Sequence, residues 1–79
     1  MKNQDAVTAL AALAQEHRLA VFRMLVRAGP EGMSAGAIAD KLSLPASSMS
    51  FHLSHLNRSG LITQRREGRS LIYAADFDR

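Results

Sequence analysis

In the middle of the chain, apolar residues recur every three or four positions, and this spacing predicts two helices joined by a tight turn. Ser34 suits the start of the first helix, because its hydroxyl can accept a backbone N–H that the first turn leaves unpaired. Pro45 ends that helix, since Pro disfavours the α conformation in the preceding residue but fits the first turn of a new helix. The second helix is expected to begin at residue 45 or 46 and to end at Gly60, a left-handed C-cap.

The second of these helices has two different sides. One side is expected to be buried and carries Ala46, Met49, Leu53 and Leu56. The other carries Ser47, Phe51, Ser54 and Arg58, flanked by Ser48, Ser50 and His55. Solvated helix faces favour Glu, Lys and Gln, which are better helix formers than Ser. Small polar side chains suit a helix that lies close against a DNA major groove, which offers hydrogen-bond donors and acceptors. A Ser-rich surface helix without a special role is the alternative.

Two further helices are predicted before this pair, at residues 4–14 and 16–28. The first is rich in Ala and so apolar that it needs cover, either from its own domain or from a dimer partner. The second is expected to bury a stripe that contains Leu19, Phe22 and Val26, with Met24 and Leu25 beside it. Gly29 and Pro30 end it.

A β-hairpin is predicted after the helices, with strands at residues 61–66 and 69–74 around Gly68. Leu71 and Tyr73 share one face of the return strand and are expected to dock on the helices. The predicted fold class is mostly α with a small β-hairpin (α+β). Four helices followed by a basic hairpin are the order of a winged helix-turn-helix.

Composition and charge narrow the function. The 79 residues suffice for one domain, taken as residues 1–79, with a net charge of +3. The positive excess lies between residues 43 and 75, which contain four Arg and only one Glu. Such an excess is expected of a protein that binds a polyanion. No apolar run could span a membrane and no signal-peptide pattern is present, so a cytoplasmic protein is expected. The absence of Cys excludes disulfides and thiolate metal ligands within these residues.

Three alternative functions fit the sequence less well. No catalytic constellation or phosphate-binding motif is present, so we predict no catalytic residues, no cofactor and no enzyme. His52 and His55 are one helix turn apart, but two ligands do not form a structural zinc site, so no metal is expected. A winged helix that binds only protein remains the alternative function. It predicts no salt dependence, whereas DNA binding through several Arg predicts affinity that falls steeply with salt.

Three segments resemble a known family. Residues 12–32 (ALAQEHRLAVFRMLVRAGPEG), 50–62 (SFHLSHLNRSGLI) and 65–73 (RREGRSLIY) are similar to the ArsR/SmtB-type bacterial transcriptional repressors, and the likeness extends over nearly the whole chain. It implies a homodimeric repressor that holds a double-stranded DNA operator until an effector, such as a metal or metalloid, lowers its affinity.

The resemblance also implies roles for particular residues. Ser47, Ser50 and Phe51 are expected to lie nearest the bases, with Ser48 and His55 at the margin of the contact. Arg66 and Arg69 are the expected contacts of the wing, and Ser34 is expected to hold a phosphate at the start of its helix. Phe51 can pack on a thymine methyl group.

The sequence matches the effector-binding sites of this family less well than its DNA-binding segments. One metal site of the family needs Cys near residues 34 and 36, where this chain has Ser34 and Gly36. Other family sites, and half of the usual dimer interface, belong to a C-terminal helix that would begin near residues 75–79 and is not included in these residues. The residues of these motifs are most similar to a branch of the family that senses arsenite. The resemblance therefore implies an arsenic-type effector, bound outside these residues.

Overall fold

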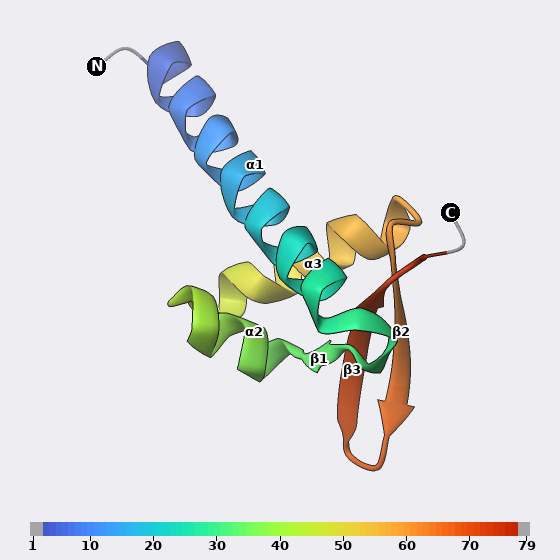
Figure 1. Cartoon of the computed structure of the whole chain (residues 1–79). Coiled ribbons are helices and arrows are strands. Elements are labelled where there is room, and N and C mark those ends of the chain that lie inside the picture. Colours follow the sequence, from blue (N-terminus) through green and yellow to red (C-terminus); the bar gives the residue numbers. More distant parts are fainter. Residues whose placement is uncertain (1–2, 78–79) are drawn as a thin grey trace.

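Three α-helices and a small antiparallel sheet make up the computed structural model, which describes residues 3–77 (Figure 1). In chain order the elements are α1 (Asn3–Ala28), the 3-10 turn η1 (Gly29–Glu31), β1 (Met33–Ser34), α2 (Ala35–Leu42), α3 (Ala46–Arg58), β2 (Ile62–Glu67) and β3 (Ser70–Ala75). The strand order in the sheet is β1-β3-β2. This arrangement confirms the predicted winged helix-turn-helix, in which α2 and α3 form the helix-turn-helix and β2 and β3 form the wing.

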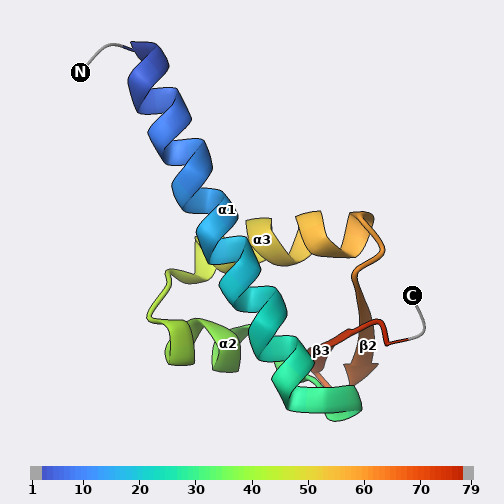
Figure 2. The same cartoon turned by 45° about the horizontal axis from the view of Figure 1, so that its top comes forward.

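Asn3–Ala28 form a single helix of 26 residues, so the prediction of two helices at 4–14 and 16–28 was wrong. Gln15 does not interrupt the helix, because strong helix formers surround it and no Gly or Pro occurs before Gly29. At 1.5 Å per residue α1 is about 39 Å long. Its second half crosses the rest of the domain and its first half extends beyond it, as both views in Figures 1 and 2 show.

The buried stripe of α1 also differs from the expected one. Val21 and Leu25 are fully buried, whereas Leu19 and Val26 are 48% and 43% exposed. Phe22 and Met24 pack against the core only in part. Apolar side chains occur on more than one side of α1, and contacts with α3 and β3 decide which side is covered. The core also takes Ile38 from α2, Met49, Leu53 and Leu56 from α3, and Ile62 from β2.

The helix-turn-helix forms as predicted. The Ser34 hydroxyl accepts a hydrogen bond from the Ala37 backbone N–H at 3.2 Å and caps α2. Ser43 ends α2 in the left-handed conformation, with φ of 55°. Pro45 is the N-cap of α3, and Gly60 takes a φ of 78° directly after the C-cap Ser59. These local signals therefore fix the positions at which α3 starts and ends.

The wing is displaced by one residue from the predicted strands. Glu67 pairs with Ser70 across a two-residue turn in which Gly68 has a φ of 60°. Tyr73 packs against the core as expected, but Leu71 is 38% exposed and does not dock fully on the helices. The strand β1 was not predicted, because it consists of two residues that become a strand only by pairing with Ile72 and Tyr73.

Candidate nucleic-acid interface

The helix α3 presents a polar outer surface next to a buried apolar one. Met49, His52, Leu53 and Leu56 are buried. Ala46 was expected to join them but is exposed, because it is the first residue of the helix. The residues Ser47, Ser50, Phe51, Ser54 and Arg58 are all exposed, and we call these five the recognition face. The predicted outward side of α3 therefore lies in solvent.

Phe51 is the largest side chain of the recognition face and is 56% exposed. The Arg18 guanidinium of α1 lies 5.8 Å from the centre of its ring, a distance typical of a cation–π contact. Ser48 and His55 are partly buried at the flanks of the face. The ring of Phe51 is thus held beside α1, while much of its surface is open to a ligand.

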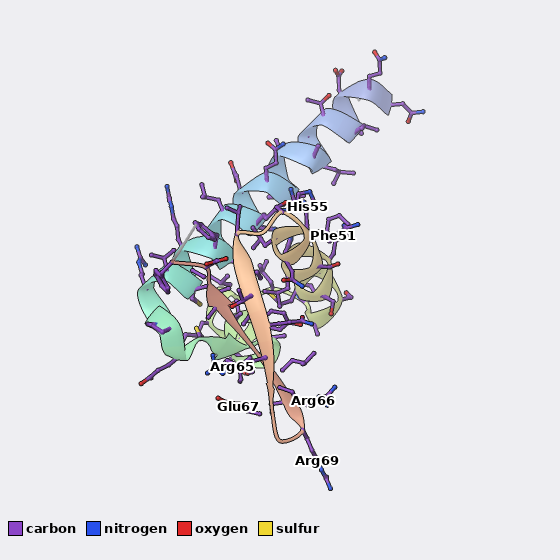
Figure 3. All side chains as sticks on the ribbon, turned by 90° about the vertical axis from the view of Figure 1, so that its right-hand side faces the viewer. Phe51, His55, Arg65, Arg66, Glu67 and Arg69 are labelled. Carbon is purple, nitrogen blue, oxygen red and sulfur yellow. The ribbon has the colours of Figure 1, made fainter. Side chains whose placement is uncertain are left out.

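The wing carries two unpaired cations. Arg66 and Arg69 are exposed, and neither forms a hydrogen bond or ion pair with any residue between 3 and 77. In Figure 3, Arg69 extends from the tip of the hairpin and Arg66 points to the opposite side from Arg65. Two free guanidinium groups on a projecting hairpin are suited to phosphate oxygens.

Arg65 has a structural role that the sequence did not reveal. Its Nη1 and Nη2 donate hydrogen bonds to the carbonyl oxygens of Pro30 and Glu31, at 3.2 and 2.6 Å. Its Nε donates to Glu67 Oε1 at 2.9 Å. Arg65 therefore ties the wing to the turn after α1. The alternation of side chains along β2 places Arg65 and Arg66 on opposite faces, but only the fold brings η1 within reach of Arg65.

Ser34 lies at the start of α2 and is partly buried. Its hydroxyl accepts a backbone N–H from within the first turn of α2, so the side chain already serves as a cap. Contact between a DNA phosphate and this helix start stays a prediction.

Cationic and imidazole side chains gather where α1 crosses α3. His52 is only 3% exposed, and its Nδ1 has no hydrogen-bond partner among the described residues. The His17 ring meets it edge-on, with 6.0 Å between the ring centres. Burial lowers the pKa of His52 below its usual 6.5, and the nearby Arg18, His17 and His55 lower it further. His52 is therefore neutral in the folded protein at neutral pH. Among residues 3–77 no three His, Cys, Asp or Glu side chains are grouped to hold a metal.

A pH dependence of stability follows from the lowered pKa of His52. Below about pH 6.5 the unfolded chain binds a proton at this imidazole, whereas the folded protein does not, so stability falls as the pH falls. We expect His52 to contribute a slope of at most about 1.4 kcal/mol per pH unit. Urea unfolding at pH 7.5, 6.5 and 5.5 measures it. The His52→Leu variant should show a shallower dependence, and an equal slope in both proteins would contradict the assignment to His52.

Comparison with known proteins identifies the family. The family model described as a helix-turn-helix domain matches residues 13–65. The chain belongs to the helix-turn-helix domain family. The matched residues run from the middle of α1 through α2 and α3 into β2, and so include the whole recognition face.

Curated relatives of this helix-turn-helix protein include a nodulation protein and a transcriptional activator. It is 36% identical over 80 residues to the nodulation protein NolR of Rhizobium meliloti, an alignment that covers 98% of this chain and 63% of NolR. It is 37% identical over 68 residues to the transcriptional activator HlyU of Vibrio cholerae, covering 86% of this chain and 60% of HlyU. The chain thus spans less than two thirds of the length of these curated relatives.

Solved structures agree with the fold. Reduced HlyU from Vibrio cholerae superimposes with a TM-score of 0.69 at 34% identity, covering 92% of this chain and 75% of that one. The homodimeric winged helix-turn-helix DNA-binding domain of Mb0332 from Mycobacterium bovis has a TM-score of 0.69 at 25% identity, covering 95% and 72%. Both structures therefore share the winged helix-turn-helix fold of this chain. None of the helices within residues 3–77 is long and apolar enough to cross a bilayer.

Proposed function

We propose that this protein is an ArsR-type repressor that binds a specific DNA operator as a homodimer and is released by an effector. The ArsR likeness is supported by the three sequence motifs and by Mb0332, which is described as a candidate ArsR-family regulator. Repression would follow from occupation of the operator itself.

One observation carries the DNA-binding part of the proposal. A helix that presents three Ser side chains, one half-exposed ring and one Arg lies on the same domain as a hairpin with two unpaired Arg. Hydroxyls, a ring and a guanidinium can contact base edges in the major groove, and free Arg side chains can contact phosphates. We propose that Ser47, Ser50 and Phe51 select the sequence, with Ser48 and His55 at the edge of the contact. Arg66 and Arg69 would supply affinity that does not depend on sequence. The two unpaired Arg side chains of the wing support a polyanionic partner.

Variants of the recognition face test this assignment. We expect Ser47→Ala, Ser50→Ala and Phe51→Ala to change which operator is preferred, with about 1–3 kcal/mol lost per base contact removed. The measurement is selection from a random duplex library, followed by titration of the selected and of random duplexes. Ser54→Ala, on the same helix side but outside the proposed base contacts, is the matched control. If the selected sequence stays the same in all three variants, the face does not read bases.

The homodimer would use the side of α1 that faces away from the core. Leu19 and Val26 lie two helix turns apart on one side of α1 and are 48% and 43% exposed. Apolar residues at this spacing are typical of a helix that packs on another helix. We expect sedimentation velocity to show a dimer at tens of micromolar and a monomer for the Leu19→Glu/Val26→Glu variant. An unchanged sedimentation coefficient would exclude this side as the interface.

A further inference from the structure

The wing is supported by a third strand over only part of its length. β1 pairs with β3 at Met33–Tyr73 and Ser34–Ile72, and Ile72 also pairs with Arg65 of β2. The sheet is therefore three strands wide as far as the rung formed by Ser34, Ile72 and Arg65. From this rung to the tip, only β2 and β3 are paired among residues 3–77. A two-stranded ribbon is marginally stable by itself and twists more than a wider sheet, so the contacts at this rung determine where the tip points.

Arg65 adds side-chain hydrogen bonds at this rung. β3 lies between β2 and β1 in the sheet, yet the Arg65 guanidinium reaches the turn that leads into β1. It donates to the carbonyl oxygens of Pro30 and Glu31 at 3.2 and 2.6 Å. The turn η1 uses the Gly29 carbonyl for the Gly32 N–H, at 3.1 Å, and the end of such a turn leaves further carbonyls for other donors. Arg65 thus joins the outer strand of the wing to the end of α1.

Arg65 is not free to bind a phosphate in the way that Arg66 and Arg69 are. Three of its N–H groups are engaged, and Glu67 Oε1, 2.9 Å from its Nε, balances its charge. Figure 3 shows Arg65 and Glu67 on one side of the hairpin and Arg66 on the other. The Glu67 carboxylate would also repel a phosphate on its side. Any contribution of Arg65 to DNA binding is therefore indirect.

We propose that Arg65 is a positioning residue for DNA binding. By tying the wing to η1, it holds Arg66 and Arg69 where both reach the phosphates beside the recognition face, a role that rests on the proposed function. Arg66 is the first residue beyond the rung, so a change in the direction of the hairpin moves both free guanidinium groups. The Arg65 and Glu67 side chains are 43% and 58% exposed, so their pair adds little to stability. The order of the wing is what depends on Arg65.

Arg65→Lys tests the positioning role, because it keeps the positive charge. A Lys ammonium is a point charge on a flexible stem and cannot present the planar fork that holds two carbonyls and a carboxylate. In ¹⁵N-labelled protein without DNA, we expect the heteronuclear NOE of the Gly68 and Arg69 amides to fall by about 0.2. Arg23→Lys makes the same exchange at an exposed position of α1 and should leave these values unchanged. A wing that stays equally ordered in Arg65→Lys would overturn the proposal.

DNA binding is the second measurement. At about 0.15 M salt, Arg65→Lys should bind every duplex about tenfold more weakly than the original protein, and Arg23→Lys should stay within about twofold. When Arg66→Ala and Arg69→Ala are already present, Arg65→Lys should change the affinity by no more than about twofold, because the residues that Arg65 positions are gone.

Two results of the titrations would overturn the positioning role. An equal tenfold loss with and without the two wing Arg would mean that Arg65 acts independently of them. Unchanged affinity in Arg65→Lys would mean that only its charge counts, since Lys can replace a simple phosphate contact. A wing that loses order in Arg65→Lys while even the original protein binds no duplex would contradict the proposed function instead.

Discussion

Replacing Gly32 by Ala is expected to lower the free energy of unfolding by about 3 kcal/mol or more, a large share of the roughly 4–12 kcal/mol typical of a domain of this size. Gly32 has a φ of 71° and a ψ of −168°, a region of backbone conformation that is almost restricted to Gly. A Cβ at this position would lie 2.3 Å from the backbone oxygen of Tyr73. Since that oxygen belongs to the backbone of β3, the clash can be relieved only by moving the strand or the turn that contains residue 32.

Gly29→Ala is the matched control for this prediction. Gly29 also has a positive φ, of 76°, but a Cβ there would have no atom within 4 Å. The Gly29→Ala variant should therefore lose only about 1–2 kcal/mol of unfolding free energy, because Ala is strained in the left-handed conformation. Urea unfolding of the two variants, followed by circular dichroism, gives both free energies. Equal losses would show that the approach of β3 to the turn after α1 does not constrain the fold.

The second large effect is expected from the wing. We expect the Arg66→Ala/Arg69→Ala variant to bind every duplex about 100-fold more weakly at 0.15 M salt, because two charge-assisted hydrogen bonds of about 1.5 kcal/mol each are removed. The slope of log affinity against log salt should become less steep by about 1.8, since each phosphate contact contributes about 0.9. The preference among operator sequences should remain, because phosphate contacts carry no base information.

Arg23→Ala/Arg27→Ala removes the same number of positive charges from exposed positions of α1 and serves as the control. Its salt slope should change by much less than that of the wing variant. Titration of a fluorescent duplex at four salt concentrations gives both slopes. Equal slopes for the two double variants would mean that the wing acts only through net charge and makes no direct contacts.

The sequence by itself determined the segments whose signals are local. The Ser34 cap, the stop at residues 43–45 and the positive φ of Gly60 each depend on a few neighbouring residues, and all three occur as predicted. The exposed side of α3 was also predictable, because helical spacing separates its Ser residues from Met49 and Leu53. The wing was found to within one residue, since a Gly between two β-branched segments marks a hairpin.

The tertiary structure decided the features that depend on distant residues. Apolar side chains lie around much of α1, so only its contacts with α3 and β3 select Val21 and Leu25 over Leu19 and Val26. The strand β1 exists because β3, nearly 40 residues later, supplies its hydrogen-bond partners, as the pairing of Met33 with Tyr73 shows. Strand alternation places Arg65 and Arg66 on opposite faces, but Arg65 ties the wing to η1 because the fold brings the carbonyls of Pro30 and Glu31 beside it. Local propensity specifies where helices and turns begin and end, whereas burial and long-range pairing require knowledge of which segments meet.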